Sequence, residues 1–126
     1  MKNTIISFIV FISTIIFISF SLKYLNTISL NLKQNNIKLE NNIKENSWEK
    51  ANKASEEFIN QWNKSSKKLA LFLNHDELDK INYEITELSY FVKTKDKDEC
   101  LSRTTKIKFF LKHILELEKI NIENVF

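Results

Sequence analysis

Apolar residues recur every three or four positions over most of the chain, which is the spacing of one face of an α-helix. Three successive stripes predict helices at about 47–73, 75–95 and 98–119. The first stripe consists of Trp48, Ala51, Ser55, Phe58, Trp62, Ser65, Leu69 and Phe72. The other two consist of Leu78, Ile81, Ile85, Leu88 and Val92, and of Ile107, Phe110, Leu111, Ile114 and Leu117. Amphipathic helices of similar length joined by short turns predict an up-down-up bundle over residues 46–126.

Each of these helices is preceded by the signature of a capping box, an Asn or Asp followed three residues later by Glu. The three pairs are Asn46 with Glu49, Asn74 with Glu77, and Asp96 with Glu99. The chain contains no glycine and no proline, so tight β-hairpin turns lack their usual residues. Both observations favour an all-α fold.

The N-terminal part of the chain is different, because residues 4–22 are apolar or hydroxyl-bearing and carry no charge. About 20 such residues cross the hydrocarbon core of a bilayer as a helix. We interpret residues 1–22 as an uncleaved transmembrane anchor that contacts the lipid bilayer through residues 4–22. The alternative is a cleaved signal peptide, since Ser19 and Ser21 have the spacing of a cleavage site. The apolar run is longer than the core of a typical signal peptide, which favours the anchor.

A very short flank precedes the anchor, and such a flank most simply stays in the cytoplasm. We therefore expect a single-pass protein of the cell membrane whose C-terminal domain is extracytoplasmic. Residues 23–45 are polar, with Leu25, Leu32 and Leu39 seven positions apart. One narrow apolar stripe is weak as a core element. We predict a polar helical stalk there, between the anchor and the bundle.

Charge and composition exclude several kinds of function. Residues 46–126 contain equal numbers of basic and acidic residues, with Arg103 as the only arginine, which argues against nucleic-acid binding. The single cysteine, Cys100, forms neither an internal disulfide nor a thiolate metal site by itself. No Ser/His, Cys/His or HExxH arrangement is present, so we expect no enzymatic activity, no catalytic residue and no cofactor.

One candidate site joins the only two histidines of the chain. The up-down-up topology brings His75 and His113 to nearly the same level of the bundle, with Asp79 and Glu116 one helical turn away. Two imidazoles and two carboxylates are ligands that Zn²⁺ accepts. The metal site is one hypothesis. The other interpretations are that His75 packs at a helix end while His113 faces water, or that the pair acts as a protonation switch.

Three aromatic residues are candidates for binding a partner. Trp48 and Trp62 lie on the first bundle stripe, where anchoring of the core is the simpler role. Phe126 ends an apolar tail, "INIENVF", which either packs over the end of the bundle or docks into another protein. The long stripe over residues 48–72 also suits a coiled coil between two chains, which would make a homo-oligomer.

Together these features predict an accessory or interaction module at the cell envelope, whose partner is another membrane or envelope protein. The alternative function is an extracytoplasmic ligand- or metal-sensing module that uses the His/acid cluster. Neither a catalytic motif nor a known binding motif decides between these two functions.

Several segments resemble one family of small bacterial proteins. They are "WEKA" (48–51), Trp62, "FLNHDELDKI" (72–81), "IKFFLKHILELE" (107–118) and "NIENVF" (121–126). These are similar to the family called domain of unknown function 4363, found in low-GC Gram-positive bacteria. The resemblance implies an N-terminal membrane helix and a helical domain, with no established activity, cofactor or catalytic residue.

Overall fold

The described part of the chain is almost entirely helical. The computed structural model describes the backbone of residues 1–125 and the side chains of residues 1–116. Its helices are α1 (Lys2–Lys44), α2 (Trp48–Leu69), α3 (His75–Thr94) and α4 (Lys97–Val125). No strand occurs among the described residues, so the prediction of an all-α fold is confirmed.

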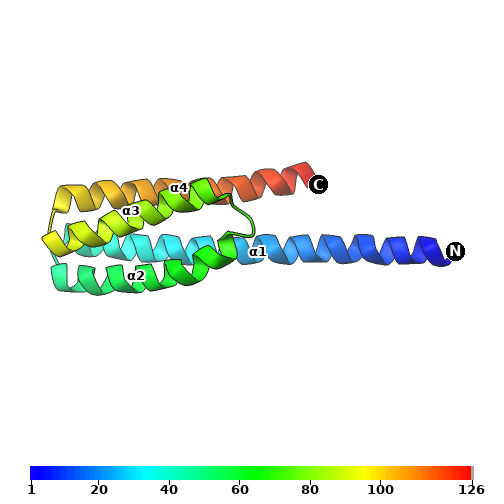
Figure 1. The fold of residues 1–126 in the computed structure, drawn as a ribbon, viewed down its shortest axis with the longest axis horizontal. Helices are drawn as coiled ribbons and strands as arrows, with labels where there is room; N and C mark the ends of the chain where they lie inside the picture. Colours follow the sequence, from blue (N-terminus) through cyan, green and yellow to red (C-terminus); the bar gives the residue numbers. More distant parts are fainter. Residues whose placement is uncertain (126) are drawn as a thin grey trace.

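The four helices form a bundle in which each one runs back alongside the helix before it (Figure 1). The packed pairs are α1 with α2, α2 with α3, α3 with α4, and α4 with α1. Helix α1 is much longer than its neighbours, and its N-terminal end projects beyond the other three helices (Figure 1). The C-terminal end of α4 reaches past the α2–α3 loop on the side where α1 leaves the bundle (Figure 1).

The second half of α1 is a bundle helix, which corrects the prediction of a separate stalk at residues 23–45 followed by three packed helices. One face of this half is fully buried against α2 and α4. That face consists of Leu25, Ser29, Leu32, Asn36, Leu39 and Ile43. The stripe is weak when judged alone, since two of its members are polar. It becomes a core face because two other helices supply the opposing side chains.

Two of the three predicted caps are confirmed. The Oδ1 atom of Asn74 accepts a hydrogen bond from the Glu77 amide at 3.0 Å. The Oδ1 atom of Asp96 accepts one from the Glu99 amide at 3.3 Å. Each bond satisfies a backbone donor that a helix start leaves free.

The third predicted cap was wrong, because Asn46 ends α1 and does not begin α2. Asn46 has a left-handed backbone with φ of 59°, and the amide of Ser47 donates to the carbonyl oxygen of Asn42 at 2.9 Å. Asparagine tolerates this conformation better than most residues. In a chain without glycine it therefore closes the helix.

The end of α2 also differs from the prediction. The stripe predicted a helix that continued to about residue 73, with Phe72 in the core. Instead α2 ends at Leu69, and a turn follows in which the amide of Phe72 donates to the carbonyl oxygen of Leu69 at 2.9 Å. This turn leaves Leu71 82% and Phe72 43% exposed.

Two buried polar contacts tie α4 to its neighbours. The Nδ2 atom of Asn36, which has no exposed surface, donates to the carbonyl oxygen of Thr104 at 3.0 Å. The guanidinium of Arg103 donates to the Glu84 carboxylate at 2.9 Å, and both side chains are largely buried. The hydrogen bond and the negative charge of Glu84 raise the pKa of Arg103 further. Contacts of this kind specify the register between helices, since a shifted register would leave them unpaired.

The role of α1 in the core is testable at two neighbouring apolar positions. Leu39 has no exposed surface, whereas Ile37 is 37% exposed. We expect Leu39→Ala to lower the free energy of unfolding by roughly 2–5 kcal/mol, because it leaves a cavity in the core. We expect Ile37→Ala to have a much smaller effect. Denaturant unfolding of the full chain in mild detergent, followed by tryptophan fluorescence, measures both changes. Equal, small effects would mean that this part of α1 behaves as a separate stalk.

Candidate functional site

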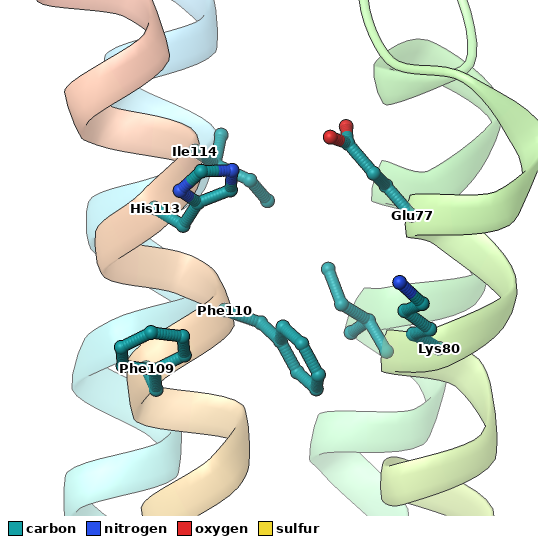
Figure 2. A pocket seen from close by; sticks show the side chains of 7 residues that line it. Glu77, Lys80, Phe109, Phe110, His113 and Ile114 are labelled. Carbon is teal, nitrogen blue, oxygen red and sulfur yellow. The ribbon is translucent and has the colours of Figure 1, made fainter.

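A pocket lies between α3 and α4 (Figure 2). It has a volume of about 240 Å³. Helix α3 supplies Glu77, Lys80 and Ile81, and α4 supplies Phe109, Phe110, His113 and Ile114. Figure 2 shows Glu77 and Lys80 facing the labelled α4 side chains across the pocket.

The pocket has an apolar floor and a polar rim. Ile81 and Ile114 are buried core residues, and they close the bottom. Phe110 is half-buried, and Phe109 is 69% exposed. Around this apolar surface lie a carboxylate, an amine and an imidazole, which belong to Glu77, Lys80 and His113. An exposed aromatic side chain surrounded by polar groups is typical of a protein-binding surface.

The pocket is small compared with sites that bind cofactors. Sites for small molecules usually have volumes of about 300–1,000 Å³ and enclose most of the ligand. The α3–α4 pocket is smaller and open to solvent.

Sequence patterns did not single out Phe109, although they contained a signal for it. Phe109 and Phe110 are adjacent, and adjacent residues on a helix point in directions about 100° apart. Both rings therefore cannot face the same core. The ring centroids lie 6.3 Å apart, edge to face, and the outer ring is the exposed one.

The structure does not bring the four candidate metal ligands together. His75 and Asp79 lie beside Trp62 and Lys67 in a depression between α2 and α3. His113 lies in the α3–α4 pocket instead. The two histidines are thus on different sides of α3, and both are exposed, as is Glu116. Among the described side chains, no group of three or more His, Cys, Asp or Glu residues has the arrangement of a metal site.

Both tryptophan side chains pack in or against the hydrophobic core. Trp62 is 2% exposed, and its Nε1 atom donates to the Oδ1 atom of Asn82 at 3.2 Å. Trp48 is half-buried and packs against the same core. The third aromatic candidate, Phe126, lies outside the described residues.

Cys100 is a core residue with the properties of an unreactive thiol. It has no exposed surface. Burial, together with the charges of Asp96 and Glu99, raises the pKa of its thiol to about 11. The thiolate is the nucleophilic form, so the folded protein holds this sulfur in its inert state at neutral pH.

The buried thiol predicts a loss of stability at high pH. In the unfolded chain the thiol ionises near its ordinary pKa of 9.0, whereas in the folded chain it stays protonated up to about 11. The folded state binds the extra proton between these values, so the free energy of unfolding falls as the pH rises through them. Relative to Cys100→Ala, we expect the wild type to lose about 2 kcal/mol between pH 8 and pH 10.5. Parallel pH profiles of the two proteins in denaturant unfolding would contradict this.

The separation of the histidines predicts that zinc does not stabilise the fold. We expect the double variant His75→Ala, His113→Ala to melt at the same temperature as the wild type, with or without added zinc. A ligand that binds only the folded state raises the melting temperature. Thermal unfolding followed by circular dichroism measures the effect. A zinc-dependent rise in the wild type that the double variant lacks would restore the metal-site hypothesis.

Comparison with known proteins identifies one family that matches most of the chain. The model of a family described as a domain of unknown function (DUF4363) matches residues 19–125. Most of the apolar N-terminal segment lies before the start of this match. Comparisons with curated proteins and with solved structures gave no match. Because the match covers most of the chain, the protein belongs to the DUF4363 family of domains of unknown function.

Proposed function

We propose that the protein is a single-pass, membrane-anchored helical module that binds another membrane or envelope protein. The observation that carries this proposal is the division of α1 into two halves. The second half packs in the bundle. The first half is long and apolar enough to cross a membrane, and none of its most apolar stretch is buried.

An exposed apolar helix is unfavourable in water, and a bilayer removes that cost. Phe17 and Phe20 are each 72% exposed. The helix continues without a break into the bundle, so a bilayer around its first half would hold the bundle close to the membrane surface.

The α3–α4 pocket supports the binding role. It combines the exposed ring of Phe109 with a buried apolar floor and a polar rim. Aromatic residues, phenylalanine among them, are enriched in protein interfaces relative to the rest of the surface. We propose that an apolar side chain of the partner enters this pocket, and that no catalytic residue or cofactor takes part.

Sensing of a metal by His75, Asp79, His113 and Glu116 would need these residues to meet. His75 and Asp79 line one depression and His113 lines another, so we do not adopt this alternative.

Co-purification tests the proposal. The full chain, tagged at its C-terminus, is extracted from its native membrane with mild detergent, and a separate sample of the same membrane is washed with carbonate to test the anchor. We expect one membrane or envelope protein to be recovered in near-equal amount. We expect Phe109→Ala to reduce its recovery at least about tenfold, equivalent to 1.4 kcal/mol of binding energy.

The matched control is Tyr90→Ala, since Tyr90 is 60% exposed but lies between α2 and α3, away from the pocket. It should leave the recovery unchanged. Release of the wild type by carbonate would disprove the anchor. Recovery of the chain alone would disprove the binding role, and an equal loss in both variants would disprove the role of the pocket.

A further inference from the structure

The α2–α3 loop lies at the end of the bundle from which α1 projects (Figure 1). This loop exposes two large apolar side chains, Leu71 at 82% and Phe72 at 43%. No cap or turn requires a large apolar residue at either position. Their exposure at this end of the molecule suggests that something other than water covers them.

Contacts between α1 and α2 fix the level of the loop along α1. Lys38 pairs with Glu57, the Asn35 amide donates to Gln61, and the Lys68 Nζ atom lies 5.4 Å from the centroid of the Tyr24 ring. The two helices therefore run antiparallel, with Lys68 level with Tyr24. Leu71 lies in the turn that directly follows the end of α2 at Leu69. Taken together, the contacts place it close to the level of Tyr24, next to the end of the apolar segment, residues 4–22.

The groups around the loop match the layers of a bilayer interface. Tyr24 is 44% exposed and directly follows Lys23 at the end of the apolar segment. Tyrosine rings and lysine amines are common at the headgroup level of membranes, where the apolar part of each side chain is buried and the polar end is hydrated. The ammonium group of Lys68 lies over the Tyr24 ring and ties this layer to α2.

We propose that the α2–α3 loop is a second membrane contact, which inserts Leu71 and Phe72 into the outer part of the same bilayer that holds α1. Lys23, Tyr24 and Lys68 then lie among the phospholipid headgroups. Asp76 and Asp79, in the first turns of α3, partly offset the positive charge of the lysines. Apolar insertion beside the anchor therefore drives the contact, and it does not require anionic lipid. This inference rests on the proposed anchoring by α1.

A second membrane contact would restrict the orientation of the bundle, which the α1 anchor by itself does not. A helix that crosses a bilayer alone leaves the attached domain free to tilt and to rotate about its axis. A loop that dips into the interface beside it fixes both. The bundle would then present its α3–α4 pocket in a constant orientation relative to the membrane plane.

Site-directed fluorescence tests the contact in the full chain, reconstituted into phosphatidylcholine vesicles at about one chain per vesicle. In a Cys100→Ala background, single substitutions Leu71→Cys, Phe11→Cys and Tyr90→Cys each carry an environment-sensitive dye. All three native side chains are exposed, so the dye does not disturb the core. Quenching by nitroxides at shallow and deep positions of the lipid chains is compared with quenching by aqueous iodide.

We expect the probe at residue 11 to be quenched by the deep nitroxide, and the probe at residue 71 by the shallow one. We expect iodide to quench the probe at residue 90 at least about threefold more than the probe at residue 71. A probe at residue 11 that is open to iodide would overturn the anchor itself. A probe at residue 11 in lipid, with residue 71 as open to iodide as residue 90, would overturn the loop contact alone.

Three further measurements test what covers the loop. A label placed by Phe72→Cys should report the same shallow depth, and a water-exposed label there would count against insertion. Shielding of residue 71 that appears only when several chains share a vesicle would assign the surface to a second copy of the protein. Shielding that requires phosphatidylglycerol in the vesicles would show that charge, and not apolar insertion, drives the contact.

Discussion

The burial of one face of α1 between α2 and α4 is the contact on which the rest of the structure depends. The face extends from Leu25 to Ile43 and is closed to solvent along its whole length. Without it, α2, α3 and α4 would have an open apolar side, and a bundle of only about 80 residues would have little core to stabilise it. The same helix continues into the exposed apolar segment. The packing of α1 in the bundle therefore also fixes the direction in which that segment leaves the bundle.

Along α1 nothing in the backbone marks the change from bundle helix to apolar segment. The buried face uses positions three and four apart, and half-buried Ile18 and Leu22 continue that spacing towards the N-terminus. What changes is the exposed side of the helix, where Lys38 gives way to Phe17 and Phe20 towards the N-terminus. In the proposed anchor, the boundary is therefore the point where the exposed side changes from charged to apolar residues, and Tyr24 lies close to it.

The polar contacts in the core limit how the helices can be arranged. Asn36 joins α1 to α4 through the Thr104 carbonyl, and Glu84 joins α3 to α4 through Arg103. Arg103 also lies within 6 Å of two aromatic rings, Tyr83 and Phe91. A planar, permanently charged guanidinium suits such a site better than a lysine, which gives a structural reason for the only arginine of the chain. These contacts fix the side of α3 that faces α4, and so they determine which residues form the pocket.

The sequence by itself determined the helices, their order, two of the three helix caps and the apolar N-terminal segment. Each of these depends on local chemistry: a helical period, a capping side chain or a run of uncharged residues. Sequence also placed His75 and His113 at a similar level of the bundle. Only the tertiary structure decided that residues 23–45 belong to the core, since a weak stripe is buried when two other helices oppose it. Only the tertiary structure placed the two histidines on different sides of α3 and Phe109 on the surface. Spacing along a chain determines the level of a residue on a helix, but the direction in which its side chain points depends on how each helix is rotated against its neighbours.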